Sequence, residues 1–386
     1  MTPLEQVSLM RLHHYQDSSY KSNAMRKDIY CEMSFLLLCV SKLENGLSSF
    51  ETYIEYELWN TISKTILSSN INLHLDMRKD EFEAEYTKIE NGRREAARKG
   101  QQYDMSPRDR LVWNIEAKQK NQELHLLLSE SNPLTNNFLL ELDKHYSGIY
   151  FTCTNVEMCQ KMIDEYGILV LCPNNILDFK EVLTDNGVAL HKDNSRGWKS
   201  ILSEKLLPCN AMVIVDNYIL TDTKKMEENL SEIIDALEPK IQKLTIPFQI
   251  TIFSLLADSK KRPMPVDCRW DIIKTIMGNK NVYISILKCK DDIFHDRTLL
   301  TNNQLIGCGG GFELFKNKKS TKTTTVNIVC PYLNLSVKWA KKGYSNVYDD
   351  VNKLFNDKNT PSYGGNITYS FPIFSVGEKV NRLLFQ

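Results

Sequence analysis

The adjacent side chains of His295, Asp296 and Arg297 combine three groups that can act on a phosphate. An imidazole can transfer a proton or attack as a nucleophile, and a guanidinium can donate two parallel hydrogen bonds to phosphate oxygens. In a strand, His295 and Arg297 would share one face and Asp296 would point to the other. The triplet therefore predicts a catalytic or binding site for a phosphate group. A structural knot of hydrogen bonds and ion pairs is the alternative.

An earlier stretch of the chain partly repeats this pattern. The segment VDNYILTD (residues 215–222) aligns with HDRTLLTN (residues 295–302), so that Asp216 matches Asp296 and the Leu-Thr pairs coincide. Both segments follow apolar runs that are typical of buried strands. We therefore expect a duplicated α/β unit with Asp216 and Asp296 on adjacent central strands, in which only the second copy carries a histidine.

Four further residues are candidates for ligand binding: Asp216, Asp222, Gly310 and Asn302. Asp216 and Asp222 lie at and beyond the end of a predicted strand, the end at which α/β sheets usually bind ligands. With Asp296 they could hold a divalent metal, although helix-capping and turn roles are favoured, and otherwise no cofactor is expected. Gly310 belongs to the run GCGGG, which lacks the ending of a phosphate loop. Such glycines indicate a bulge or the close approach of a ligand.

The spacing of these residues resembles a known family. Phospholipase-D-type enzymes carry H-x-K-x4-D twice, and this chain has H-x-R-x4-N in His295, Arg297 and Asn302. The segment 295–315 is more similar still to the degenerate phospholipase-D-like domain at the C-terminus of microtubule-interacting-and-trafficking proteins. That family has the same His-Asp-Arg, an Asn at the last position and a Gly-Phe pair like Gly311-Phe312. The resemblance covers residues 205–335 at most.

The resemblance implies binding more than catalysis. In that family the domain binds phosphoinositide membranes and lacks a demonstrated catalytic pair. Here Arg297 replaces the lysine, and Val215 stands where a second histidine would be needed. Our hypothesis is an accessory or effector protein of a microbial system, such as a defence system, that recognises a nucleic acid or another phosphate-bearing ligand without turnover. A phosphodiesterase or nuclease that uses His295 is the alternative, and a phosphoinositide membrane binder is the third.

The elements that position these residues fall into two parts, giving an α+β chain overall. Residues 1–148 are predicted to be mainly α-helical, since apolar residues recur at helical spacing over residues 28–66. Ser106, Pro107 and Asp109 predict a helix start, and that helix is expected to run towards Leu128. Residues 149–386 alternate short apolar runs with helical patterns, which predicts a phospholipase-D-like α/β domain. In this second part, Asn155 and Gly167 should begin and end a helix.

Charge gives no general indication of a partner. The 386 residues contain 48 Lys and Arg and 48 Asp and Glu, so any nucleic-acid binding must come from local patches. The basic run 93–99 is predicted to be a solvated helix face with Glu90 and Glu95, and contact with a phosphate backbone is the less favoured reading. The N-terminal helical region could also contact a partner protein.

The cysteines and the apolar runs indicate a cytoplasmic protein. None of the ten cysteines forms a C-x-x-C pair, and most lie in apolar stretches, as expected for reduced buried thiols. The first residues contain no apolar stretch of signal-peptide length, and the longest apolar run, FLLLCV, is too short to cross a bilayer.

Overall fold

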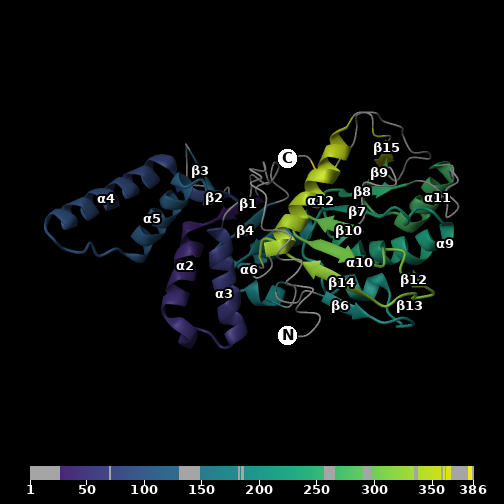
Figure 1. Ribbon diagram of the computed structural model, residues 1–386, viewed down its shortest axis with the longest axis horizontal. Helices are drawn as coiled ribbons and strands as arrows, with labels where there is room; N and C mark the ends of the chain where they lie inside the picture. Colours follow the sequence, from purple (N-terminus) through teal and green to yellow (C-terminus); the bar gives the residue numbers. More distant parts are fainter. Residues whose placement is uncertain are drawn as a thin grey trace, which may run out of the picture.

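The chain folds around two β-sheets in this computed structural model (Figure 1). The structure describes residues 27–68, 71–129, 148–180, 183, 187–255, 266–289, 297–333, 338–357, 360, 362–366 and 381–384. The described helices include none that is long and apolar enough to cross a membrane.

The first sheet has five parallel strands in the order β3-β2-β1-β4-β5. These strands are β1 (Lys27–Cys31), β2 (Ile71–Arg78), β3 (His125–Ser129), β4 (Ile149–Phe151) and β5 (Leu169–Leu171). Helices cover both faces, as parallel sheets require. Ile29 and Cys31 pack into one core cluster with residues of the helices between β1 and β3, and Tyr30 packs into another with Tyr150 and α6 (Val156–Tyr166).

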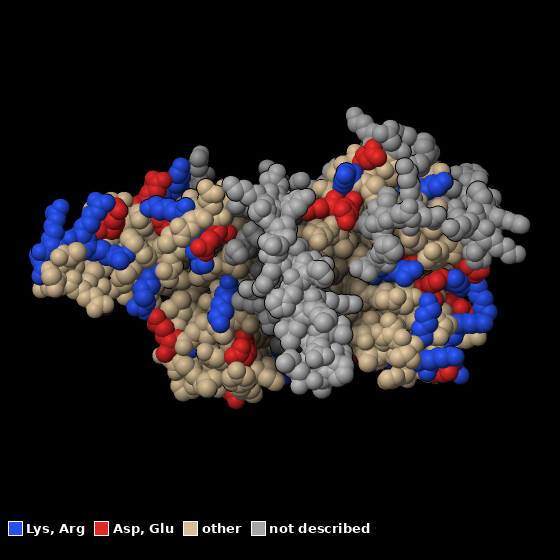
Figure 2. All heavy atoms as spheres, in the orientation of Figure 1, with Lys and Arg blue, Asp and Glu red and all other residues tan. Residues whose placement is uncertain are grey.

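The helices between β1 and β3 form two hairpins. These elements are α2 (Met33–Glu44), the 3₁₀ turn η1 (Gly46–Ser49), α3 (Tyr53–Ile66), α4 (Lys79–Arg98) and α5 (Pro107–Lys120). The pair α4 and α5 extends away from the sheet at the far left of Figure 1. Figure 2 shows Lys and Arg side chains gathered at the free end of this hairpin.

Residues 27–129 are rich in helices, as expected. The predicted boundary at residue 148 was wrong, however, because these residues do not form a separate helical region. Residues 27–129 contribute three strands to the first sheet, and the boundary at 148 and 149 separates β3 from β4 of that same sheet. The sequence of β2, INLHLDMR, alternates apolar and polar residues. In the structure its residues, from Ile71 to Arg78, alternate in the same way between buried and half-buried. That period of two is the mark of a strand with one face against the core.

The second sheet has eight strands in the order β15-β9-β8-β7-β10-β11-β14-β6. Its strands are β6 (Gly187–Leu190), β7 (Ala211–Val215), β8 (Phe248–Ser254), β9 (Val282–Lys288), β10 (Thr298–Thr301), β11 (Leu305–Cys308), β14 (Thr324–Val329) and β15 (Ser362–Asn366). The strands β7, β8 and β9 are parallel neighbours, and β10 begins an antiparallel half. A short ribbon of β12 (Phe315–Lys316) and β13 (Lys319–Ser320) lies apart from both sheets.

Both faces of this central sheet are buried. Met212 and Ile214 of β7 pack with residues of α8 (Trp198–Leu202), α10 (Ser231–Ile241) and α11 (Val266–Met277). Val213 and Val215, on the other face, share a core cluster with α12 (Lys338–Asn356) and with the first sheet. Burial on both faces explains why these strands appear in the sequence as continuous apolar runs.

Local sequence signals placed several helix ends correctly. Ser106 accepts a hydrogen bond from the Asp109 amide and forms a capping box, so α5 begins where predicted, although it ends at Lys120 rather than near Leu128. Asn155 caps α6, and Gly167 ends that helix with a φ of 63°, in the left-handed region that glycine tolerates. Side chains that bond to nearby amides leave such clear signals because the partners are close in sequence.

The expected internal duplication is wrong. The segment that begins at Val215 ends β7 and then turns, so Leu220 and Thr221 lie in the loop before α9 (Thr223–Lys225). The segment that begins at His295 instead enters β10, so Leu300 and Thr301 lie in a strand. The two strands are neighbours but antiparallel, with Thr298 opposite Val215. The matching letters therefore occupy different conformations, and Asp296 lies outside the described residues.

The cysteines give a first prediction. The nine cysteines with described side chains are free thiols, and of these only Cys153 is exposed. Burial raises the pKa of the Cys31 thiol and of the Cys39 thiol, to about 12 for Cys39, so they stay protonated and react slowly. We expect a thiol reagent to modify Cys153 of the native protein first, and to titrate ten thiols after denaturation without reductant. Cys153→Ser should remove that first modification, whereas fewer than ten thiols would reveal a disulfide.

Candidate functional site

Two of the residues singled out from the sequence, Asp216 and Arg297, meet at the edge of the second sheet where its parallel strands end. Asp216 directly follows β7, and Arg297 directly precedes β10. Because β7 and β10 pair antiparallel with Val215 opposite Thr298, these two residues lie side by side. This edge is the one at which α/β sheets commonly bind ligands.

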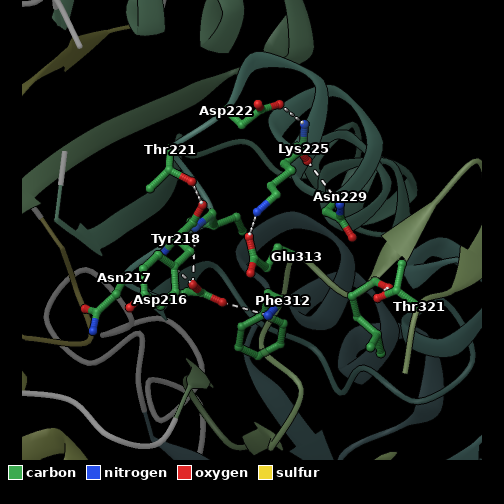
Figure 3. Close-up of polar contacts among 12 residues, drawn as sticks. Asp216, Asn217, Tyr218, Thr221, Asp222, Lys225, Asn229, Phe312, Glu313 and Thr321 are labelled. Carbon is green, nitrogen blue, oxygen red and sulfur yellow. Dashed lines mark hydrogen bonds and ion pairs between the residues drawn. The ribbon is translucent and has the colours of Figure 1, made fainter. Parts of the chain in front are cut away.

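The Asp216 carboxylate organises the loops at this edge. One oxygen, Oδ1, accepts hydrogen bonds from the backbone amides of Tyr218 at 2.8 Å and Ile219 at 3.2 Å. The other oxygen, Oδ2, accepts the amide of Phe312 at 2.6 Å, from a segment 96 residues away (Figure 3). Burial raises the pKa of Asp216, and the amides of Tyr218 and Phe312 together with the charge of Arg297 oppose that shift. Both oxygens are therefore committed to the backbone.

Arg297 lies half-buried beside this carboxylate. Its guanidinium carbon is 5.6 Å from the centroid of the Tyr218 ring, a cation–π contact. Gly311 lies against the same group: a Cβ built there would be 3.4 Å from Asp216 Oδ2 and 3.8 Å from Arg297 Nε. The φ of Gly311 is 81°, so a larger residue would be strained as well as crowded.

The hydrogen-bond donors of Arg297 are not used within the described part of the chain. No described acceptor takes a hydrogen bond from its guanidinium, although Asp216 is close enough to act on it through charge. Lys225, by contrast, forms an ion pair with Glu313, the residue after Phe312 (Figure 3). At this edge Lys225 is therefore neutralised by a direct partner, whereas Arg297 keeps five N–H donors for another group.

The remaining predicted residues have structural roles or lie elsewhere. Asp222 accepts the amide of Lys225 at 3.2 Å and caps α9. Asn302 lies at the far end of β10 from Arg297, and its Oδ1 accepts the amides of Asn210 at 3.0 Å and Ala211 at 3.1 Å. The motif H-x-R-x4-N is thus not one cluster. His295 and Asp296 lie outside the described residues.

Two other predictions for this region can be compared with the structure. Gly310 is buried, and its carbonyl accepts the Lys322 ammonium at 3.4 Å, so this glycine shapes the loop beside Gly311. Asp216 and Asp222 use carboxylate oxygens for backbone amides, and Asp296, the third residue of the predicted metal site, lies outside the described residues. Among the residues that the structure describes, no group of three or more His, Cys, Asp or Glu is placed to hold a metal ion.

Sequence reasoning missed a pair of carboxylates at the matching edge of the first sheet. Glu32 follows β1 and accepts the Cys153 amide at 2.7 Å, while Asp76 of β2 accepts the Met33 amide at 2.5 Å. Burial, with Glu32 nearby, raises the pKa of Asp76 to about 6. The strand order changes direction between β1 and β4, so this is the switch point of the sheet. Reading this part as helical concealed that these acids lie at strand ends.

Comparisons with known proteins give little. No family model matches the chain, and no curated protein matches it. One solved structure that it resembles is that of TrmBL2, described as an archaeal chromatin protein with a novel mode of DNA binding. The identity is 12%, the match covers 46% of this chain and 59% of that one, and the TM-score is 0.23. A likeness this weak carries no argument about fold or function.

Proposed function

We propose that this chain recognises a phosphate-bearing ligand at Arg297 and binds it without turnover. The observation that carries the proposal is a half-buried guanidinium, held in place at the ligand-binding edge of the central sheet, with no hydrogen-bond acceptor among the described residues. Arginine donates bidentate hydrogen bonds to phosphate oxygens, and its planar group loses little freedom when it does so.

The neighbours of Arg297 support this role. A carboxylate beside an arginine usually accepts two of its donors, but both oxygens of Asp216 accept backbone amides instead. Asp216 therefore offsets the charge of Arg297 without occupying its hydrogen bonds. The ring of Tyr218 limits where the guanidinium can lie. A site that is already positioned needs less ordering when a ligand arrives.

The binding test uses inorganic phosphate and pyrophosphate as probes, with sodium chloride at equal ionic strength as the reference. We expect both probes to raise the melting temperature of the wild-type protein, since a ligand that binds only the folded state stabilises it. Arg297→Lys should weaken binding about tenfold and Arg297→Ala further, because a planar fork becomes a point charge and is then lost. Arg196→Lys, at an exposed arginine in the turn before α8, is the matched control.

Two results would contradict the proposal. One is equal stabilisation of the wild type and Arg297→Ala by phosphate. The other is cleavage of single-stranded DNA or RNA, with or without Mg²⁺ or Mn²⁺, that His295→Ala abolishes; the loss would then fall on a chemical step and favour a phosphodiesterase. Binding only to vesicles that contain phosphoinositide would favour a membrane role instead.

A further inference from the structure

A second surface with side chains suited to binding phosphate groups lies on the hairpin of α4 and α5, far in sequence from Arg297. This hairpin extends from the body of the molecule, and basic side chains gather at its free end (Figure 2). Residues 88–120 contain nine Lys and Arg and five Asp and Glu, whereas the whole chain has equal numbers of each. The whole hairpin, residues 79–120, has ten Lys and Arg and nine Asp and Glu, so the excess of positive charge is confined to the part formed by residues 88–120, where it attracts an anion.

Aromatic and cationic side chains alternate along the hairpin. The Arg93 guanidinium carbon lies 3.9 Å from the centroid of the Trp113 ring. The Trp113 ring stacks on that of Tyr86, with centroids 5.4 Å apart and an angle of 20° between the planes. Lys120 lies 4.3 Å from the Tyr86 centroid and donates to its hydroxyl at 2.8 Å. The four side chains come alternately from α4 and α5, so they tie the two helices together.

This stack leaves the edge of Arg93 available. A guanidinium that lies flat on a ring uses its face, whereas its N–H donors point outward in its own plane. No described residue accepts a hydrogen bond from Arg93 or forms an ion pair with it, and the side chain is exposed. Trp113 thus holds a cation in a fixed position on the surface of the hairpin.

The neighbouring charges divide into paired and unpaired groups. Arg94 pairs with Glu90 at 2.9 Å and Lys99 with Glu95 at 2.6 Å, which confirms the solvated, salt-bridged helix face predicted from the sequence. Arg98 is exposed and has no ion pair within the described residues. Arg93 and Arg98 are five residues apart in α4, about 7.5 Å along the helix axis and about 140° around it, so the two guanidinium groups can contact phosphates on different sides of the helix.

We infer that the α4–α5 hairpin is an arm that binds the phosphate backbone of a nucleic acid, with Arg93 and Arg98 as contact residues and Trp113 as a positioning residue. The contact is with phosphates rather than bases. The rings of Trp113 and Tyr86 each already contact a neighbouring ring and a cation. Binding should therefore be insensitive to sequence and strongly dependent on salt.

The test measures binding of the full-length protein to fluorescent single-stranded and double-stranded DNA by anisotropy, at several salt concentrations. The double variant Arg93→Ala/Arg98→Ala should weaken binding at least tenfold and reduce the slope of log K against log salt concentration by about 1.5, because two phosphate contacts are lost. Lys316→Ala/Lys319→Ala, which removes the same charge from the exposed β12–β13 ribbon, should leave both quantities unchanged.

Trp113→Leu separates positioning from charge. It retains every cation but removes the ring under Arg93, so affinity should fall several-fold while the variant keeps the helical circular dichroism of the wild type. The inference is overturned if the wild type binds neither DNA at low salt, if the arm and ribbon variants weaken binding equally, or if Arg93→Ala/Arg98→Ala binds like the wild type. Arg297→Ala should leave DNA binding by the arm intact, so failure of the phosphate site and failure of the arm are separate results.

Discussion

Replacing Asp216 with alanine should lower the free energy of unfolding by roughly 3 to 5 kcal/mol. The wild-type carboxylate is buried and accepts three backbone amides, those of Tyr218, Ile219 and Phe312. Alanine leaves all three donors without that partner, and each unsatisfied buried donor costs about 1 to 3 kcal/mol, less whatever entering water recovers. The loss should also release the segment at Gly311 from the end of β7. Chemical denaturation followed by circular dichroism measures the change.

Two further variants test whether the hydrogen bonds are the cause. Asp216→Asn retains one oxygen for Tyr218 and Ile219 but turns an amide donor towards the Phe312 amide, while it also removes a buried charge, so its loss should be smaller. Asp222→Ala removes one helix cap that accepts a single amide, and should cost only about 1 kcal/mol. Equal losses in Asp216→Ala and Asp222→Ala would mean that Asp216 does not organise this edge.

The parts of the fold that could be predicted are those with strong local patterns. The strands β7 and β8 are buried along their whole length, so each stands out as an apolar run, and the caps of α5 and α6 bond to amides three residues away. The first sheet was missed because β1 is short and adjoins a helix directly, with Glu32 alone between them. Its parallel partners are brought together by long crossovers, and no local pattern reports such pairing.

The site was predicted in part, and for a wrong reason. Asp216 and Arg297 are neighbours, but antiparallel pairing brings them together, not a duplication. Asn302 was grouped with Arg297 because a motif spacing was read without its geometry. Five residues of strand extend about 17 Å, so the two positions lie at opposite ends of β10. No sequence pattern marks Tyr218 or Glu313 as part of the site, because their roles depend on contacts that form only in the folded chain.

Lys27→Met should produce the second large effect, a change in how stability depends on pH. Lys27 begins β1, is fully buried and donates to the carbonyl of Asn302 at 2.6 Å, so it links the first sheet to the second. Burial lowers the pKa of Lys27 from 10.5 to about 8, and the Coulombic effect of Asp28 opposes this shift. The unfolded chain therefore holds this proton more tightly than the folded chain does between these two values.

The sign of the effect follows from that difference in proton binding. Stability rises with pH wherever the unfolded state binds more protons, so the contribution of Lys27 improves from about pH 8 to about pH 10.5. At pH 7 the buried ammonium costs roughly 3 kcal/mol, and at pH 10 under 1 kcal/mol. Methionine does not titrate. The stability of Lys27→Met relative to the wild type should therefore fall by about 2 kcal/mol as pH rises from 7 to 10.

Measuring the difference between two proteins makes the test specific to this lysine. Burial raises the pKa of Cys209 and Cys289, so both groups make the wild type less stable as pH rises, but they do so equally in the variant and cancel. The loss of the donor to Asn302 is independent of pH and shifts the whole curve. Lys316→Met, on the exposed ribbon, controls for the removal of one lysine. A difference between Lys27→Met and the wild type that stays constant from pH 7 to pH 10 would show that Lys27 does not carry a buried charge between the two sheets.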